Sequence, residues 1–109
     1  MRTLRFIVDG ETVTKDPSCD FTGLSPRNAS EICAEFVFSP EWDGRVKVVA
    51  FQSMLDKEYE PQLLGDDNTC EIPKEALAKP AFKIHILGKH KGRVYKTTKF
   101  IVHQRGGAK

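Results

Sequence analysis

The side chains that could do chemistry in this chain are few and scattered. The histidines are His85, His90 and His103, and the cysteines are Cys19, Cys33 and Cys70. Nucleophilic catalysis needs a hydroxyl or thiol beside a base and an orienting group, and no recognisable nucleophile motif surrounds any of them. Zinc sites use closely spaced cysteine or histidine pairs. The wide spacing here predicts free, buried thiols in a reducing compartment.

Carboxylates occur in pairs at Glu41 and Asp43, Glu58 and Glu60, and Asp66 and Asp67. Glycoside hydrolysis needs two carboxylates held across a cleft at a defined separation. These pairs instead fall in turns or on alternate positions of an expected edge strand. The phosphate-binding patterns GxGxxG and GxxxxGK[ST] are absent from the sequence. We therefore expect no enzyme, no cofactor, no metal and no small-molecule substrate.

Charge is distributed unevenly along the 109 residues. Residues 1–78 hold 15 acidic and eight basic side chains, a net charge of −7, whereas residues 79–109 hold nine basic and no acidic ones. The basic region could meet an anionic partner, or its lysines could pair with acidic strands of the same domain or point into solvent. Lys83, Lys96 and Lys99 are not expected to share one strand face, which argues against nucleic acid. Tyr95 and Phe100 would still permit base stacking.

Hydrophobic alternation predicts strands in the first half of the chain. Residues 4–8 and 11–14 are joined by Asp9-Gly10, a hairpin signal. Residues 31–39 alternate with period two, and 45–52 contain a continuous apolar run. The linking segment SPEWDG (39–44) contains Pro40 and Asp43-Gly44, which predicts a β-hairpin from 30 to 52. Trp42 in this turn is expected to cover the open end of the core.

The second half predicts more strands and one helical turn. Residues 58–64 form an edge or bulged strand because of Pro61, and 73–78 form a short helical turn between two sheets. Residues 81–87 and 93–103 form a terminal hairpin, with Val94, Lys96, Phe100 and Val102 on one face. His85 and His103 are expected to be neighbours across it. Together these predict an antiparallel β-sandwich of about 7–9 strands.

The sandwich is expected to occupy residues 1–103 as a single domain, followed by a flexible tail at 104–109. A long connection crosses one end of the domain at 15–29, where Phe21 and Leu24 could anchor it to the core. No apolar run approaches the roughly 20 residues needed to cross a bilayer, so we expect no membrane partner. The N-terminus lacks the pattern of a secretory signal, which predicts synthesis in a cytoplasm without secretion.

The order of several motifs resembles the N-terminal modules of phage and prophage structural proteins, namely baseplate upper-protein and fibre-attachment domains. The motifs are FIVDG (6–10), AEFVFSPEWDG (34–44), KVVAF (47–51), CEIPKEAL (70–77) and FKIHILG (82–88). The resemblance covers nearly all of residues 4–103. It implies an Ig-like β-sandwich that serves in virion assembly rather than catalysis, with other virion proteins or a second copy as partners.

Two main hypotheses follow for the partner. A virion protein could add a strand at the edge near 58–64, or the basic region 79–109 could bind nucleic acid or another polyanion. A carbohydrate-binding sandwich that stacks sugar on Trp42 and Tyr59 is a third possibility. The candidate interaction residues are Glu58, Tyr59, Glu60, Lys83, Lys96 and Lys99.

Overall fold

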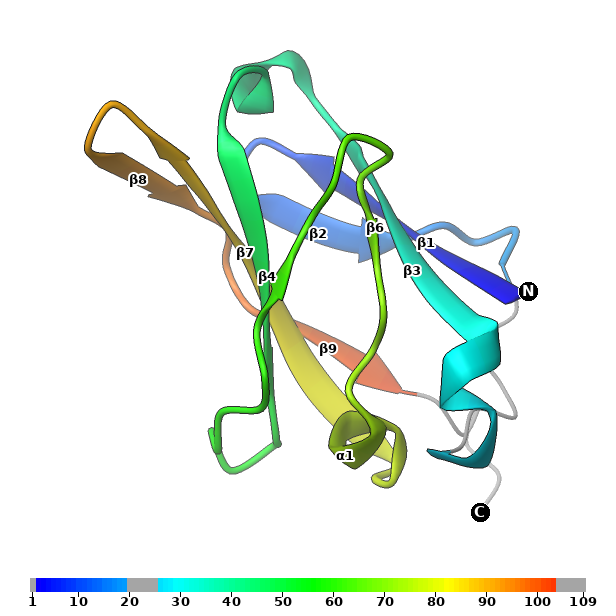
Figure 1. Ribbon diagram of the computed structural model, residues 1–109. Helices are drawn as coiled ribbons and strands as arrows, with labels where there is room; N and C mark the ends of the chain where they lie inside the picture. The colour runs from blue at the N-terminus through cyan, green and yellow to red at the C-terminus, as the bar shows by residue number, and fades with distance from the viewer. Residues whose placement is uncertain (1, 20–25, 104–109) are drawn as a thin grey trace.

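Two β-sheets packed face to face make up the described part of the chain (Figure 1). The computed structural model describes residues 2–19 and 26–103. Sheet A has the order β2 (Thr12–Lys15), β1 (Arg2–Asp9), β3 (Ile32–Phe38) and β6 (Thr69–Cys70). Sheet B has the order β5 (Gln62–Leu63), β4 (Val46–Gln52) and β7 (Ala81–His90), with β8 (Arg93–Lys96) and β9 (Phe100–His103) along the far edge of β7.

The all-β sandwich expected from the sequence is confirmed. The helical turn expected near 73–78 is also confirmed as α1 (Lys74–Leu77), which connects β6 of sheet A to β7 of sheet B. It buries Ala76 and Leu77 and packs against η1 (Pro26–Glu31) at one end of the sandwich. None of the helices in the described residues is long and apolar enough to cross a membrane.

Strand β1 organises sheet A because its alternating apolar side chains all point into the core. Leu4, Phe6 and Val8 are at most 1% exposed. The β1–β2 hairpin is confirmed, with Val8 opposite Val13. On its other side β1 pairs with β3 in parallel, from Arg2 opposite Ile32 to Val8 opposite Phe38. This parallel pair arises because β2 returns toward the start of β1, and the chain then enters β3 from η1 at that same end.

The expected hairpin at 30–52 is wrong. Strand β3 belongs to sheet A and β4 to sheet B, so the segment crosses from one sheet to the other instead of folding back within one. The crossing is made by η2 (Pro40–Trp42), a single 3-10 turn that begins at Pro40. Two apolar strands joined by a turn can either pair or face each other across a core, and here they face each other.

Trp42 fills the space between the sheets at this crossing, as the sequence predicted. Its side chain is completely buried and its Nε1–H donates a hydrogen bond to the Gly10 carbonyl at 2.9 Å. Its ring lies 5.3 Å from that of Phe38 and 4.8 Å from that of Tyr95, between centroids. Trp42 therefore joins the β1–β2 turn, the crossing turn and sheet B into one packed end. Because it is buried, its ring has no face free for a sugar.

Several expected segments are shorter than predicted or lie outside the described residues. The segment 58–64 contributes only the two-residue edge strand β5 and an isolated bridge between Glu58 and Gln52. The connection at 15–29 includes Phe21 and Leu24, which lie outside the described residues, as does the tail at 104–109.

We predict that Gly88→Ala destabilises the fold, because a Cβ on Gly88 would lie 2.7 Å from Trp42 Cζ3 and 2.9 Å from Arg45 Cδ. Overpacking of this kind typically costs about 1–3 kcal/mol. Urea unfolding monitored by Trp42 fluorescence measures the loss. Gly65→Ala is the matched control, because its nearest neighbour atom would be 3.7 Å away. Equal midpoints for wild type and Gly88→Ala would contradict the close packing.

Candidate interaction surface

A β-bulge in the terminal hairpin decides which side chains share a face. Ile84 lies opposite Phe100, but Leu87 lies opposite Lys96. Two residues of β7 therefore face three residues, 97–99, of the other strand, which is the pattern of a bulge. Thr97 makes it: its N–H donates to the Ile86 carbonyl at 3.0 Å, and its Oγ1 accepts the Ile86 N–H at 3.0 Å.

The bulge reverses the alternation that the sequence predicted for this strand. Before it, Tyr95 lies opposite buried Gly88 and points inward, whereas Val94 is 57% exposed. After it, Val102 lies opposite Phe82 and is buried. The expectation that Val94, Lys96, Phe100 and Val102 share one face is therefore wrong. An unbroken alternation cannot reveal an inserted residue, because each half of the strand still alternates correctly by itself.

Three candidate lysines gather on the outer face of sheet B, the face turned away from sheet A. Lys83 and Lys99 both contact the Asp56 carboxylate, at 2.8 and 3.4 Å. Lys96 lies opposite the outward Leu87. The expectation that Lys83, Lys96 and Lys99 do not share a face is wrong. Lys96 precedes the bulge and Lys99 follows it, and the extra residue puts both on the outer face with Lys83.

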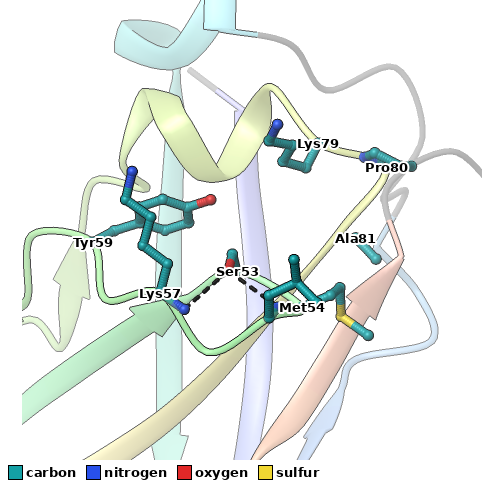
Figure 2. A pocket seen from close by; sticks show the side chains of 8 residues that line it. Ser53, Met54, Lys57, Tyr59, Lys79, Pro80 and Ala81 are labelled. Atoms are coloured by element: carbon teal, nitrogen blue, oxygen red, sulfur yellow. Dashed lines mark hydrogen bonds between the residues drawn. The ribbon is translucent and has the colours of Figure 1, made fainter.

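The Asp56 carboxylate is aimed at these lysines by a tight turn that follows β4. Asp56 has φ 66°, in the left-handed region. Ser53 Oγ accepts the N–H groups of Leu55 and Lys57 at 3.1 and 3.0 Å and holds the turn together (Figure 2). Hydrogen bonding and charge from Lys83, with a further contribution from Lys99, lower the pKa of Asp56. Asp56 therefore stays ionised and neutralises part of the cationic cluster.

A histidine and a glutamine lie within the same face. Gln52 Nε2 donates to Glu58 Oε2 at 2.7 Å, while Gln52 Oε1 is buried without a hydrogen-bond partner. His85 Nδ1 is likewise buried and without a partner. Burial, followed by the charge of Lys99, lowers the pKa of His85; Lys96 acts in the same direction and Glu58 opposes it. His85 therefore resists protonation in the folded protein.

Exposed apolar side chains alternate with the cations on this face. Val48 lies between Leu63 and Leu87, and Lys89 lies between Val46 and Val94. Val46, Leu63 and Val94 are 56%, 67% and 57% exposed. Together these side chains form the outer-face patch, which contains Val46, Val48, Leu63, Leu87, Val94, Lys83, Lys89, Lys96 and Lys99. Its apolar residues extend across the sheet from β5 through β4 and β7 to β8. Sequence reasoning missed the patch because each residue is an ordinary strand position.

Of the three remaining candidate residues, only Glu58 lies beside the patch. Glu58 lies at the border of the patch through its bond to Gln52, and Glu60 is exposed on the following loop. Tyr59 packs against the core, and its backbone N–H donates to Phe51 O at 2.9 Å. The structure therefore brings Glu58, Lys83, Lys96 and Lys99 together, but not Tyr59 or Glu60.

Tyr59 instead lines a shallow pocket that the sequence did not indicate. Figure 2 shows Tyr59 and Lys57 on one side of it and Lys79, Pro80 and Ala81 on the other. The pocket has a volume of about 470 Å³, and Met54 and Leu55 form part of its rim. Leu55 is 92% exposed. An apolar pair at the tip of a turn was the one sequence signal that could have pointed to it.

The residues considered for catalysis and metal binding lie apart. His103 lies opposite Ala81, so it is not the neighbour of His85 that the sequence suggested. The three cysteines are free and partly buried, and burial raises the pKa of the Cys70 thiol to about 12. Within residues 2–19 and 26–103, histidine, cysteine and acidic side chains nowhere form a group of three or more that could hold a metal ion.

We predict that Thr97→Val destabilises the protein by about 1–3 kcal/mol, because it leaves the buried Ile86 N–H without an acceptor. Valine keeps the shape, so the loss reports on the hydrogen bond. Chemical denaturation of the variant measures it, and Thr14→Val, at an exposed threonine of β2, provides the control. A Thr97→Val protein as stable as wild type would show that the hydroxyl does not stabilise the bulge.

We also predict that His85 makes stability fall as the pH drops below about 6.5, the ordinary histidine pKa. Its pKa is lowered in the folded protein, so the unfolded chain binds the proton first and acid favours unfolding. Above that pH His85 is neutral in both the folded and the unfolded chain, so it adds nothing to the pH dependence of the free energy of unfolding. Urea midpoints at pH about 7.5 and about 5.5, above the carboxylate range, measure it. His85→Gln should flatten the difference, and His103→Gln should keep it.

Comparisons with known proteins give this chain no relative. No protein-family model, curated protein or solved structure matches it.

Proposed function

We propose that the protein is a non-enzymatic interaction module that acts through protein–protein contacts, as a structural component of a bacteriophage or prophage particle. The particle assignment rests on the order of the motifs at 6–10, 34–44, 47–51, 70–77 and 82–88, which resembles that of phage structural modules. The interaction role rests on the outer-face patch. Its exposed valines and leucine combine with lysines on a rigid sheet, which suits a partner surface that is apolar and acidic.

The structure favours the face of sheet B over its edges for this role. The β5 edge offers only Gln62 and Leu63 after Pro61, too short a template for a long added strand. The opposite edge is interrupted by the bulge at 97–99 and carries Lys96 and Lys99. Bulges and edge lysines are devices that discourage strand addition. The proposal therefore places the partner on the patch rather than along 58–64.

Binding to nucleic acid or another polyanion is the second candidate, because Lys83, Lys96 and Lys99 share a face after all. Two features weigh against it. Asp56 already neutralises part of the charge of Lys83 and Lys99, and the whole chain carries a net charge of only +2. Retention on heparin that falls steeply with salt would support this candidate, since polyanion binding releases counterions.

We predict that the tagged protein co-sediments with particles purified from the encoding bacterium after prophage induction. The double variant Val46→Asp and Leu63→Asp should reduce incorporation at least about tenfold, which corresponds to ~1.4 kcal/mol, because charge replaces two of the apolar side chains of the patch. Quantitative mass spectrometry of gradient-purified particles measures this. Val37→Asp, at a 47% exposed valine of sheet A, is the matched control.

Circular dichroism establishes that each variant is folded before particles are analysed. Particles that lack the wild-type protein, while it accumulates unassembled, would overturn the virion role. Particles that incorporate the double variant as well as wild type would keep the virion role and overturn the patch.

A further inference from the structure

One end of the sandwich carries unpaired charges of both signs on separate structures. The positive one is a projecting ribbon, formed by the end of β7 and by β8, which we call the cationic arm (residues 89–96). Figure 1 shows it extending away from the two sheets near the η2 crossing. Its turn consists of Lys91 and Gly92, with φ 51° and 80°. Two successive positive φ values are typical of the type I′ turn, whose twist matches that of a two-stranded ribbon.

The arm carries four cations and no acid. Lys89, Lys91, Arg93 and Lys96 are all exposed. Arg5, Lys83 and Lys99 form ion pairs with described carboxylates, whereas none of the four arm cations does. Arginine and lysine at these positions therefore remain free to meet negative charge on another molecule.

The negative charges lie in three turns at the root of the arm, which we call the acidic turns. They hold Asp9 and Glu11, Glu41 and Asp43, and Asp66 and Asp67. All six side chains are exposed, and no described cation forms an ion pair with any of them.

Contacts at the base of β8 place these turns beside the arm. Thr98 N–H donates to the Glu11 carbonyl at 2.9 Å. Burial, then the charges of Glu11 and Glu41, raise the pKa of Tyr95, the arm's inward residue. Asp66 lines a hollow together with Arg45 at the start of β4. The three turns and the arm therefore belong to one end of the molecule.

This arrangement selects between possible partners. A polyanion that approached the arm would meet six carboxylates at its root, and the small net charge of the chain offers little long-range attraction. A partner that complements this end needs acidic groups to meet the arm and basic groups to meet the turns. The chain itself presents both kinds of group, and a twofold axis would bring each arm onto the turns of the other copy.

We propose that two copies of this chain associate through this end, with the cationic arm of each copy seated on the acidic turns of the other. The inference deepens the proposed function, since it rests on the chain acting through protein contacts and names a second copy as one partner. Both arm–turn contacts are equivalent by symmetry, so the contact closes as a dimer and does not propagate into a filament. Because the contacts are exposed ion pairs, the dimer is sensitive to salt.

Charge reversal tests the proposal in a form that a folding defect cannot imitate. One variant reverses the arm through Lys89→Glu, Lys91→Glu, Arg93→Glu and Lys96→Glu, which changes the charge of its four cations from +4 to −4. The other reverses the turns through Asp9→Lys, Glu11→Lys, Glu41→Lys and Asp43→Lys, which changes the charge of the six acidic positions from −6 to +2. Each alone places like charges in both contacts, so we expect at least a tenfold weaker dimer. In an equimolar mixture both contacts become complementary again, so we expect a heterodimer. Lys57→Glu with Lys79→Glu, exposed cations at the pocket, is the matched control and should dimerise as wild type does.

Sedimentation velocity at an ionic strength of about 0.01 M and about 1 M, where the Debye length falls from roughly 30 to 3 Å, measures each species. Restored heterodimer at low salt, lost at high salt, supports the proposal. A monomeric wild type at low salt, or a mixture that stays monomeric, overturns it. Duplex DNA that binds a monomeric wild type, and not the arm-reversed variant, replaces it with the polyanion candidate. A monomeric protein that still enters particles leaves the proposed function standing and removes only this inference.

Discussion

The close approach of Trp42 to Gly88 is the constraint on which one end of the sandwich depends, the end where η2 crosses between the sheets. The nearest indole carbon lies 2.7 Å from the position that a β-carbon on Gly88 would take, and the indole N–H donates a hydrogen bond to the Gly10 carbonyl. One side chain thus holds the β1–β2 turn, the crossing between sheets and β7 at a fixed separation. Tilted ring–ring contacts extend the packing of Trp42 into both sheets, to Phe38 of β3 and to Tyr95 of β8. The cationic arm begins at these contacts, because Gly88 of β7 and Tyr95 of β8 both pack against Trp42. The packing of Trp42 therefore sets the direction of the arm.

The bulge at Thr97 is the second device that shapes the surface. It lets one strand turn Tyr95 inward beside Trp42 and, a few residues later, Val102 inward against the core. An uninterrupted strand would place one of these side chains in solvent. Because Thr97 satisfies the Ile86 backbone through both its own N–H and its hydroxyl, the insertion leaves that buried pair of groups hydrogen-bonded. The same insertion gathers lysines that sequence spacing had separated.

The surface that results combines apolar and charged side chains on the strands and turns of a β-sandwich. Apolar side chains and lysines alternate over sheet B, and opposite charges stand apart at the Trp42 end. Such surfaces discriminate partners through complementary charge, while apolar contacts supply most of the affinity. This combination is the physical basis for proposing an assembly module, and it agrees with the role implied by the resemblance to phage structural modules, which stays a prediction.

The sequence by itself determined the elements whose signals are local. Alternation at Leu4, Phe6 and Val8, the Asp9-Gly10 turn, the helical turn at Lys74–Leu77 and the burial of Trp42 were all predicted correctly. Only the tertiary structure decided that β3 and β4 face each other across the core, that β1 and β3 run parallel, and that Lys83 and Lys99 share Asp56. The physical reason is that a period of two reports which side of a strand is apolar. It carries no information about which strand lies beside it, or about a single inserted residue that exchanges the two sides.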